Sequence, residues 1–139
     1  MARTLLLALL LATGSLPAAA DFVIGNCTIR VPTPPATSCP GAYLWNANLS
    51  NIDLTSANLS NANLNAANLS NTNLTNATLV GIRSGDISGT PAALPTGWLL
   101  TNGYLVGSGA SLIFANLSSA NLSGANLTSV DAGNANLSN

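Results

Sequence analysis

The chain has 139 residues, enough for one domain, and only 5% of them are charged, against about 25% in an ordinary soluble domain. It has no His, Lys or Glu, so most side-chain acid–base chemistry near neutral pH is excluded, and its three Arg are too few for a basic nucleic-acid patch. The composition predicts a protein that is not an enzyme and that needs no cofactor.

Residues 1–20 have the pattern of a secretory signal peptide. Arg3 supplies a positive charge, residues 5–12 form an apolar run, and Ala18, Ala19 and Ala20 provide the small residues before a cleavage site. An uncleaved membrane anchor would need about 20 apolar residues, far more than this run provides. We therefore expect a secreted protein, periplasmic or extracellular, with no membrane span after cleavage.

The two cysteines, Cys27 and Cys39, are predicted to form a disulfide, because export places them in an oxidising compartment. Closing a loop of this size contributes about 3 kcal/mol of stability. No metal site or catalytic thiol is expected, since either would need His or further Cys. Residues 21–41, whose loop contains Pro32, Pro34 and Pro35, are expected to form a stapled N-terminal cap with an extended path.

From Ala42 onward the chain repeats with a period of five residues, and fourteen repeats can be counted. A typical repeat has a small residue, then Asn or a substitute, then a Leu, then two variable residues; in residues 130–134 Val130 and Ala132 replace the small residue and the Leu. The repeated leucines, which we expect to form the core ladder, are Leu44, Leu49, Leu54, Leu59, Leu64, Leu69, Leu74, Leu79, Leu112, Leu117, Leu122, Leu127 and Leu137.

Neither regular element accommodates this period. On an α-helix five residues turn about 500°, so successive leucines would spiral around the rod without forming a stripe. On a flat strand an odd period sends successive leucines to opposite faces. The chain must therefore turn once per repeat, with Leu and the small residue inward and Asn, Ser and Thr outward.

The Ala-Asn-Leu-x-x pattern resembles the pentapeptide-repeat family. The resemblance implies an all-β fold, a right-handed quadrilateral parallel β-helix with four repeats per coil, so that residues twenty apart stack, as in Leu44 on Leu64. One irregular insertion interrupts this solenoid. We expect a first repeat array at 42–82, the insertion at 83–109, and a second array at 110–139.

The insertion, rich in Gly and Pro, has two interpretations. Residues 98–101 and 104–106 flank Asn-Gly and fit a β-hairpin with a type I′ turn. Alternatively Gly103–Gly107 is a degenerate repeat with Leu105 in the central position, and Gly89–Gly97 is a protruding loop. We favour the second slightly, because the second array needs a coil on which to stack. Such a loop often carries function, but Trp98 and the prolines are expected mainly to cover the seam.

The charged residues after the signal segment carry little functional information. Asp53 and Asp131 occupy Asn positions of their repeats and are expected to be exposed substitutions, not a catalytic pair. Asp86 is expected to form a weak surface ion pair with Arg83. Ten Asn-x-Ser/Thr sequons follow from the repeat itself, so glycosylation depends on the source organism.

We expect a secreted structural or interaction scaffold whose Asn and Ser rows bind a protein or glycan partner. A DNA-mimicking, gyrase-protecting protein is a weaker alternative, because this chain has few acids and an export signal. An ice-binding β-helix is also weaker, because its Thr residues do not align in rows. The chain stops at the close of a repeat without a change of composition, so we expect either an end-to-end homodimer through the C-terminal coil or a longer C-terminal region.

Overall fold

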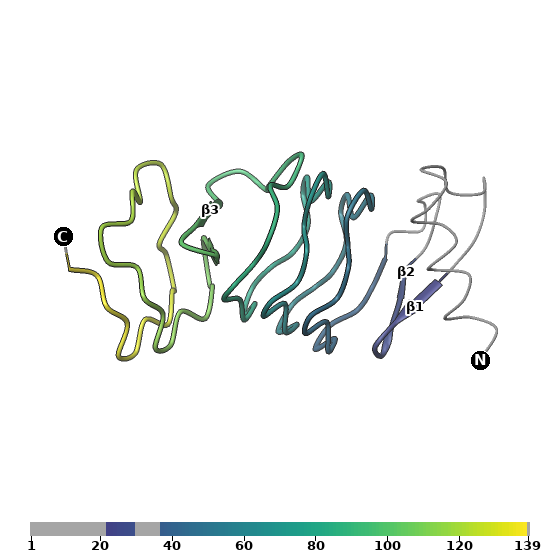
Figure 1. Cartoon of the computed structure of the whole chain (residues 1–139), viewed down its shortest axis with the longest axis horizontal. Helices are drawn as coiled ribbons and strands as arrows, with labels where there is room; N and C mark the ends of the chain where they lie inside the picture. Colours follow the sequence, from purple (N-terminus) through teal and green to yellow (C-terminus); the bar gives the residue numbers. More distant parts are fainter. Residues whose placement is uncertain (1–21, 30–36, 139) are drawn as a thin grey trace.

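The computed structural model describes residues 22–29 and 37–138. The expected signal peptide and the three prolines of the cap lie outside these residues. The described chain winds in successive coils along one long axis, from a hairpin of strands β1 (Phe22–Ile24) and β2 (Cys27–Ile29) at one end to the second array at the other (Figure 1).

Parallel bridges join residues twenty apart on four successive sides of the coil. These pairs are Tyr43 with Asn63, Asn48 with Asn68, Asp53 with Asn73, and Asn58 with Thr78. Four repeats therefore complete one coil, and the expected twenty-residue stacking is confirmed. Each side contributes a single bridged position, so the coils are four-sided but contain no extended strands.

A tight turn closes each repeat. The carbonyl of Leu44 accepts the N–H of Ala47 at 3.1 Å, and Asn46 between them has a left-handed φ of 56°. This corner position is mostly Asn, Ser or Gly along the chain, and Asn and Gly adopt positive φ at low cost. The period of five thus follows from a short bridged side plus a corner.

The eight leucines of the first array fill the tube, and none is more than 2% exposed. The small residues before them complete the interior. Thr72 occupies one of these small positions, and its buried hydroxyl donates to the Leu49 carbonyl at 2.7 Å. The inward assignment of the leucine ladder is correct throughout this array.

The ladder is incomplete in the second array. Leu112 and Leu117 are buried and Leu122 is half-buried, but Leu127 is 47% and Leu137 is 54% exposed. The expectation that all thirteen leucines are core residues is wrong for Leu127 and Leu137, because no described coil covers them.

A β-hairpin covers the N-terminal end of the tube. Strands β1 (Phe22–Ile24) and β2 (Cys27–Ile29) pair antiparallel. Cys27 is linked to Cys39 with Cα atoms 5.2 Å apart, which confirms the predicted disulfide. Cys27 and Ile29 are fully buried against the core, so the cap protects the first coil from water.

The coil continues beyond residue 82, where the first array was expected to end. Arg83, Ser88 and Ala93 form parallel bridges with residues twenty positions earlier. The expected boundary is therefore about ten residues too early for the backbone ladder. The N-terminal half of the expected 89–97 loop is part of this ladder and does not protrude.

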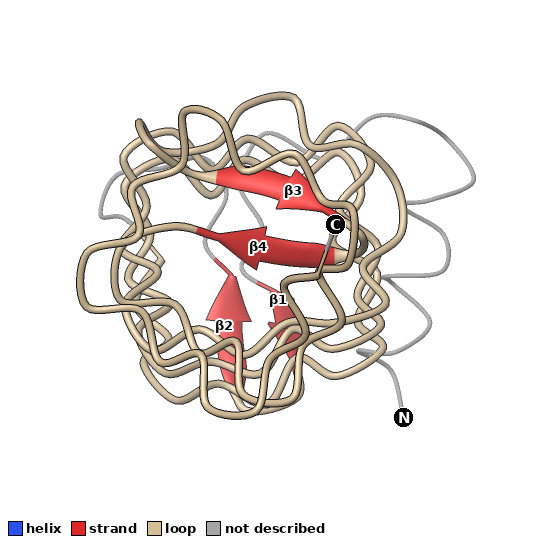
Figure 2. Cartoon of the chain, turned by 90° about the vertical axis from the view of Figure 1, so that its left-hand side faces the viewer, coloured by secondary structure: helices blue, strands red, loops and turns tan. Residues whose placement is uncertain are grey.

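The true interruption is a second hairpin. Strands β3 (Leu99–Thr101) and β4 (Tyr104–Val106) pair antiparallel across Asn102 and Gly103, both with positive φ. This confirms the hairpin interpretation, and the favoured degenerate repeat was wrong. Viewed along the long axis, the two strands cross the interior of the coil outline (Figure 2).

The hairpin accounts for the change of register between the arrays. Arg83 pairs with Ser111, 28 positions later, which is eight more than one coil requires. From Ser111 the spacing returns to twenty, with Asp131 as the next partner. The extra residues enter the tube, and the second array then resumes on the same side.

Candidate functional site

The outward Asn or Asp of each repeat holds the backbone of its own repeat. In eleven repeats its Oδ1 accepts the N–H two residues later, as Asn58 does from Ser60 at 3.1 Å. The Ser60 hydroxyl also donates to this oxygen, at 2.8 Å. These local bonds fix the side chain, so the polar rows on the outside of the coil are ordered by the fold.

Asp53 and Asp131 play the same structural part. Asp53 Oδ1 accepts from the N–H of Thr55 at 3.0 Å, and Asp131 Oδ1 accepts from the N–H of Gly133 at 3.2 Å. Both are exposed, and they belong to different bridge columns. In the described residues no three His, Cys, Asp or Glu side chains gather as metal ligands. The described ranges contain no helix that could cross a membrane.

One side of the coil differs from the others. Its bridges form a continuous column that connects both arrays, from Tyr43 through Asn63, Arg83 and Ser111 to Asp131. We call the outward residues of 43–45, 63–65, 83–85 and 111–113 the Arg83 face.

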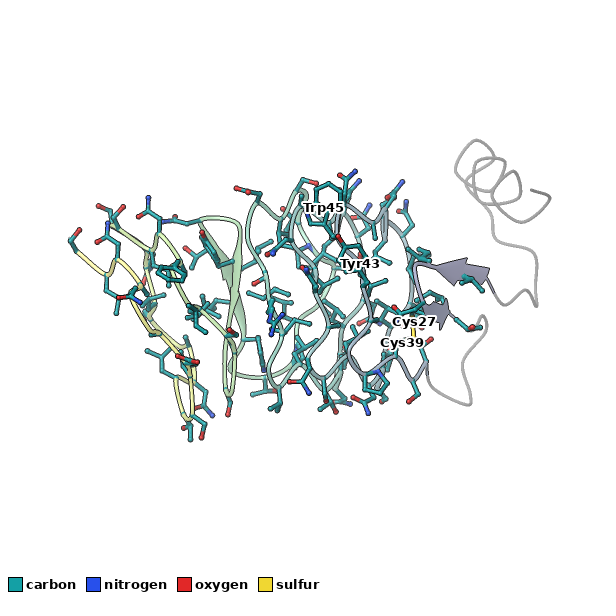
Figure 3. The ribbon with its side chains drawn as sticks, turned by 90° about the horizontal axis from the view of Figure 1, so that it is seen from below. Cys27, Cys39, Tyr43 and Trp45 are labelled. Carbon is teal, nitrogen blue, oxygen red and sulfur yellow. A yellow bond between two sulfur atoms is a disulfide. The ribbon has the colours of Figure 1, made fainter. Side chains whose placement is uncertain are left out.

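The first layer of this face carries two exposed aromatic rings. Tyr43 is 60% and Trp45 is 54% exposed, and both lie on the coil beside the disulfide-linked end (Figure 3). The cap holds this segment, because the Tyr43 N–H donates to Asn26 Oδ1 at 2.7 Å. Gly25 has positive φ and lies so close to the Tyr43 carbonyl that a Cβ would clash. The cap turn thus fixes the backbone beneath the aromatic pair.

Further toward the C-terminal end of the same face, the layer of residues 83–85 separates from the layer of residues 111–113. In the regular ladder the N–H of Leu64 donates to the Arg83 carbonyl at 2.8 Å. One layer later the equivalent N–H, that of Ser84, has no hydrogen-bond partner in the part of the chain that the structure describes. The hairpin passes here, since Leu105 N–H donates to the Ser84 hydroxyl oxygen at 2.8 Å. The ladder between these layers therefore stops after Arg83 and Ser111.

A pocket of about 270 Å³ lies at this separation. It is lined by Asn65, Arg83, Ser84, Ser111 and Ile113. Gly85, which follows Ser84, is buried, and a Cβ at this position would lie 3.2 Å from the Tyr104 ring and 3.5 Å from Asn65 Oδ1.

Arg83 makes no ion pair with any described residue, so the expected Arg83–Asp86 pair is wrong. Sequence reasoning also missed the pocket. The signal that the sequence offers is Ser84, a polar residue at a position of the repeated leucines.

Comparison with known proteins agrees with the repeat. Residues 38–76 and 108–139 match the sequence profile of pentapeptide repeats, in eight copies. A similar solved structure is that of HetL, a pentapeptide repeat protein involved in heterocyst differentiation regulation from the cyanobacterium Nostoc. The two chains are 25% identical with a TM-score of 0.34, and the match covers 72% of this chain and 46% of HetL. No curated protein matches the chain significantly.

Proposed function

Because the chain belongs to the pentapeptide-repeat family, a membership that implies a right-handed quadrilateral β-helix, we propose that it is a secreted, non-enzymatic scaffold. Its outward polar rows bind a polysaccharide, the cell envelope or another protein.

The observation that carries this proposal is the order of the outward side chains. Each Asn or Asp of the eleven ordered repeats has its Oδ1 bound to its own backbone. The Asn Nδ2 groups and neighbouring hydroxyls are then held in rows at the coil spacing of about 4.8 Å. A surface that is already ordered loses little side-chain entropy on binding.

Two features support secretion. Residues 1–20 have the three-part pattern of a signal peptide. The disulfide between Cys27 and Cys39 suits an oxidising compartment, where such bonds form and persist.

The test is a retention assay of the secreted protein on a panel of insoluble polysaccharides and isolated cell-envelope fractions. The control is a variant that keeps the inward Leu and small residues but permutes the outward Ser, Thr and Asn among repeats. Retention of the natural protein above this control supports the scaffold function. Equal retention of the two proteins throughout the panel refutes it.

A further inference from the structure

We propose that the Arg83 face binds an acidic polysaccharide, with a sugar carboxylate in the pocket and a sugar ring of the same chain stacked on Tyr43 and Trp45. This inference rests on the proposed scaffold function and names the side and the ligand class that it uses.

Four of the five residues that line the pocket carry hydrogen-bond donors, the fifth is Ile113, and none is a carboxylate. Arg83 is free of ion pairs among the described residues, and its planar guanidinium suits a carboxylate. Ser84 adds a backbone N–H without a partner in the described chain. The side chains of Asn65 and Ser111 also line the pocket and make no hydrogen bond within the described ranges.

Ser84 gives the pocket a fixed inner wall. The residue is only 6% exposed, and its hydroxyl oxygen already accepts the Leu105 N–H. That hydroxyl is held inside the tube, so the group of Ser84 that would meet an anion is its backbone N–H, which has no partner in the described chain.

The aromatic pair lies where the next part of a glycan would reach. Tyr43 and Trp45 lie on either side of the buried Leu44, and both side chains are exposed on the outside of the coil. Tyr43 and Arg83 are two layers apart in one bridge column, a distance of about 10 Å at strand spacing. A polysaccharide that lies along the coil axis would therefore contact Tyr43 and Arg83 with sugars that are close together in its own chain.

The rest of the face favours a glycan over other anions. Between the rings and Arg83 the outward residues are Asn63 and Asn65, whose amides suit sugar hydroxyls. A nucleic acid would need several clustered cations, and this face has one. Asp131 lies two layers beyond Arg83 in the same column and should weaken the attraction, so binding is expected to be moderate and to fall with added salt.

The probe is polygalacturonate, and its fully methyl-esterified form is the uncharged control with the same backbone. Affinity electrophoresis should show at least about tenfold weaker binding of the ester, and the same loss for Arg83→Gln with polygalacturonate. Trp45→Ala should weaken binding several-fold, while Trp45→Phe should retain most of it. Asp131→Asn should tighten binding. Asp53→Asn, an equivalent charge change in another column, should leave it unchanged.

A second readout separates this inference from the scaffold proposal. Titration of the protein with a galacturonate trisaccharide should shift the amide signal of Ser84 in NMR spectra, and Arg83→Gln should abolish the shift. Equal binding of ester and acid, or normal binding by Arg83→Gln, overturns the inference. If only neutral polysaccharides or a protein partner bind, the scaffold function stands and the assignment of this face falls. If nothing in the panel is retained, the scaffold function fails, and an unmoved Ser84 signal then rejects the pocket.

Discussion

The hydroxyl oxygen of Ser84 accepts the backbone N–H of Leu105 at 2.8 Å inside the tube. Ser84 occupies the central position that Leu44 and Leu64 fill in the two layers below it. A leucine there would occupy the space that β4 uses, and it would leave the Leu105 N–H without an acceptor. One polar substitution in the core ladder thus accommodates the inserted hairpin.

Replacing Ser84 tests this relationship. Ser84→Ala should lower the free energy of unfolding by about 1–3 kcal/mol, because a buried N–H loses its acceptor. Ser84→Thr keeps the hydroxyl and should lose less. Urea denaturation gives the stability, and hydrogen exchange at the Leu105 amide should accelerate in Ser84→Ala alone. Slow exchange at Leu105 in Ser84→Ala would contradict the assigned bond.

The leucine ladder should contribute unequally along the chain. Leu59 is fully buried, so Leu59→Ala should cost about 2–5 kcal/mol from lost burial and the cavity left behind. Leu137 is 54% exposed in the single chain, so in protein dilute enough to be monomeric Leu137→Ala should cost about 0.5 kcal/mol or less. Denaturant unfolding of both variants at low protein concentration measures the difference. Similar losses under these conditions would mean that the terminal coil is covered within the monomer.

The disulfide should stabilise the cap and, through it, the first coil. Replacing Cys27 and Cys39 together by Ser should reduce the free energy of unfolding by about 3 kcal/mol, mainly because the unfolded chain regains freedom. The control is the natural protein measured with and without a reductant. A double variant as stable as the oxidised protein would show that the buried hairpin alone holds this end.

The corner positions predict opposite effects for two matched substitutions. Ala66 has φ of 58° and Asn61 has φ of 60°. Because Asn tolerates this conformation better than Ala, Ala66→Asn should stabilise by about 0.5–1 kcal/mol and Asn61→Ala should destabilise by a similar amount. Thermal unfolding of the two variants is the measurement. Shifts of the same sign would show that contacts, not backbone conformation, decide these positions.

We also propose that two copies associate end to end through the C-terminal coil, where Leu127 and Leu137 are exposed. Light scattering on the purified protein should then report a dimer, and Leu137→Asp should convert it to a monomer by placing a charge in the apolar contact. Val80→Asp, an exposed apolar residue on the first array, is the control and should remain dimeric. A natural protein that is monomeric at high concentration would refute this association.

Much of the fold followed from local patterns. The resemblance to the pentapeptide-repeat family predicted the twenty-residue stacking of Asp53 on Asn73 correctly. The Cys27–Cys39 bond was also predicted correctly, because each cysteine has one available partner. The hairpin at β3 and β4 was also recognisable from Asn102-Gly103, but the need for a coil beneath the second array gave the wrong preference. The second array does stack on a coil, but that coil is the one that contains Arg83, which pairs directly with Ser111.

The sequence by itself determined the period of five and the inward leucines of the first array, because each repeat has residue types that favour one turn and one buried side chain. It also determined the disulfide-linked cap, because the chain has only two cysteines. Only the tertiary structure decided how the eight extra residues fold into the tube. The pocket at Arg83 depends on that outcome. Its walls come from layers that are far apart in the chain, and they meet only because the hairpin ends the ladder at that point.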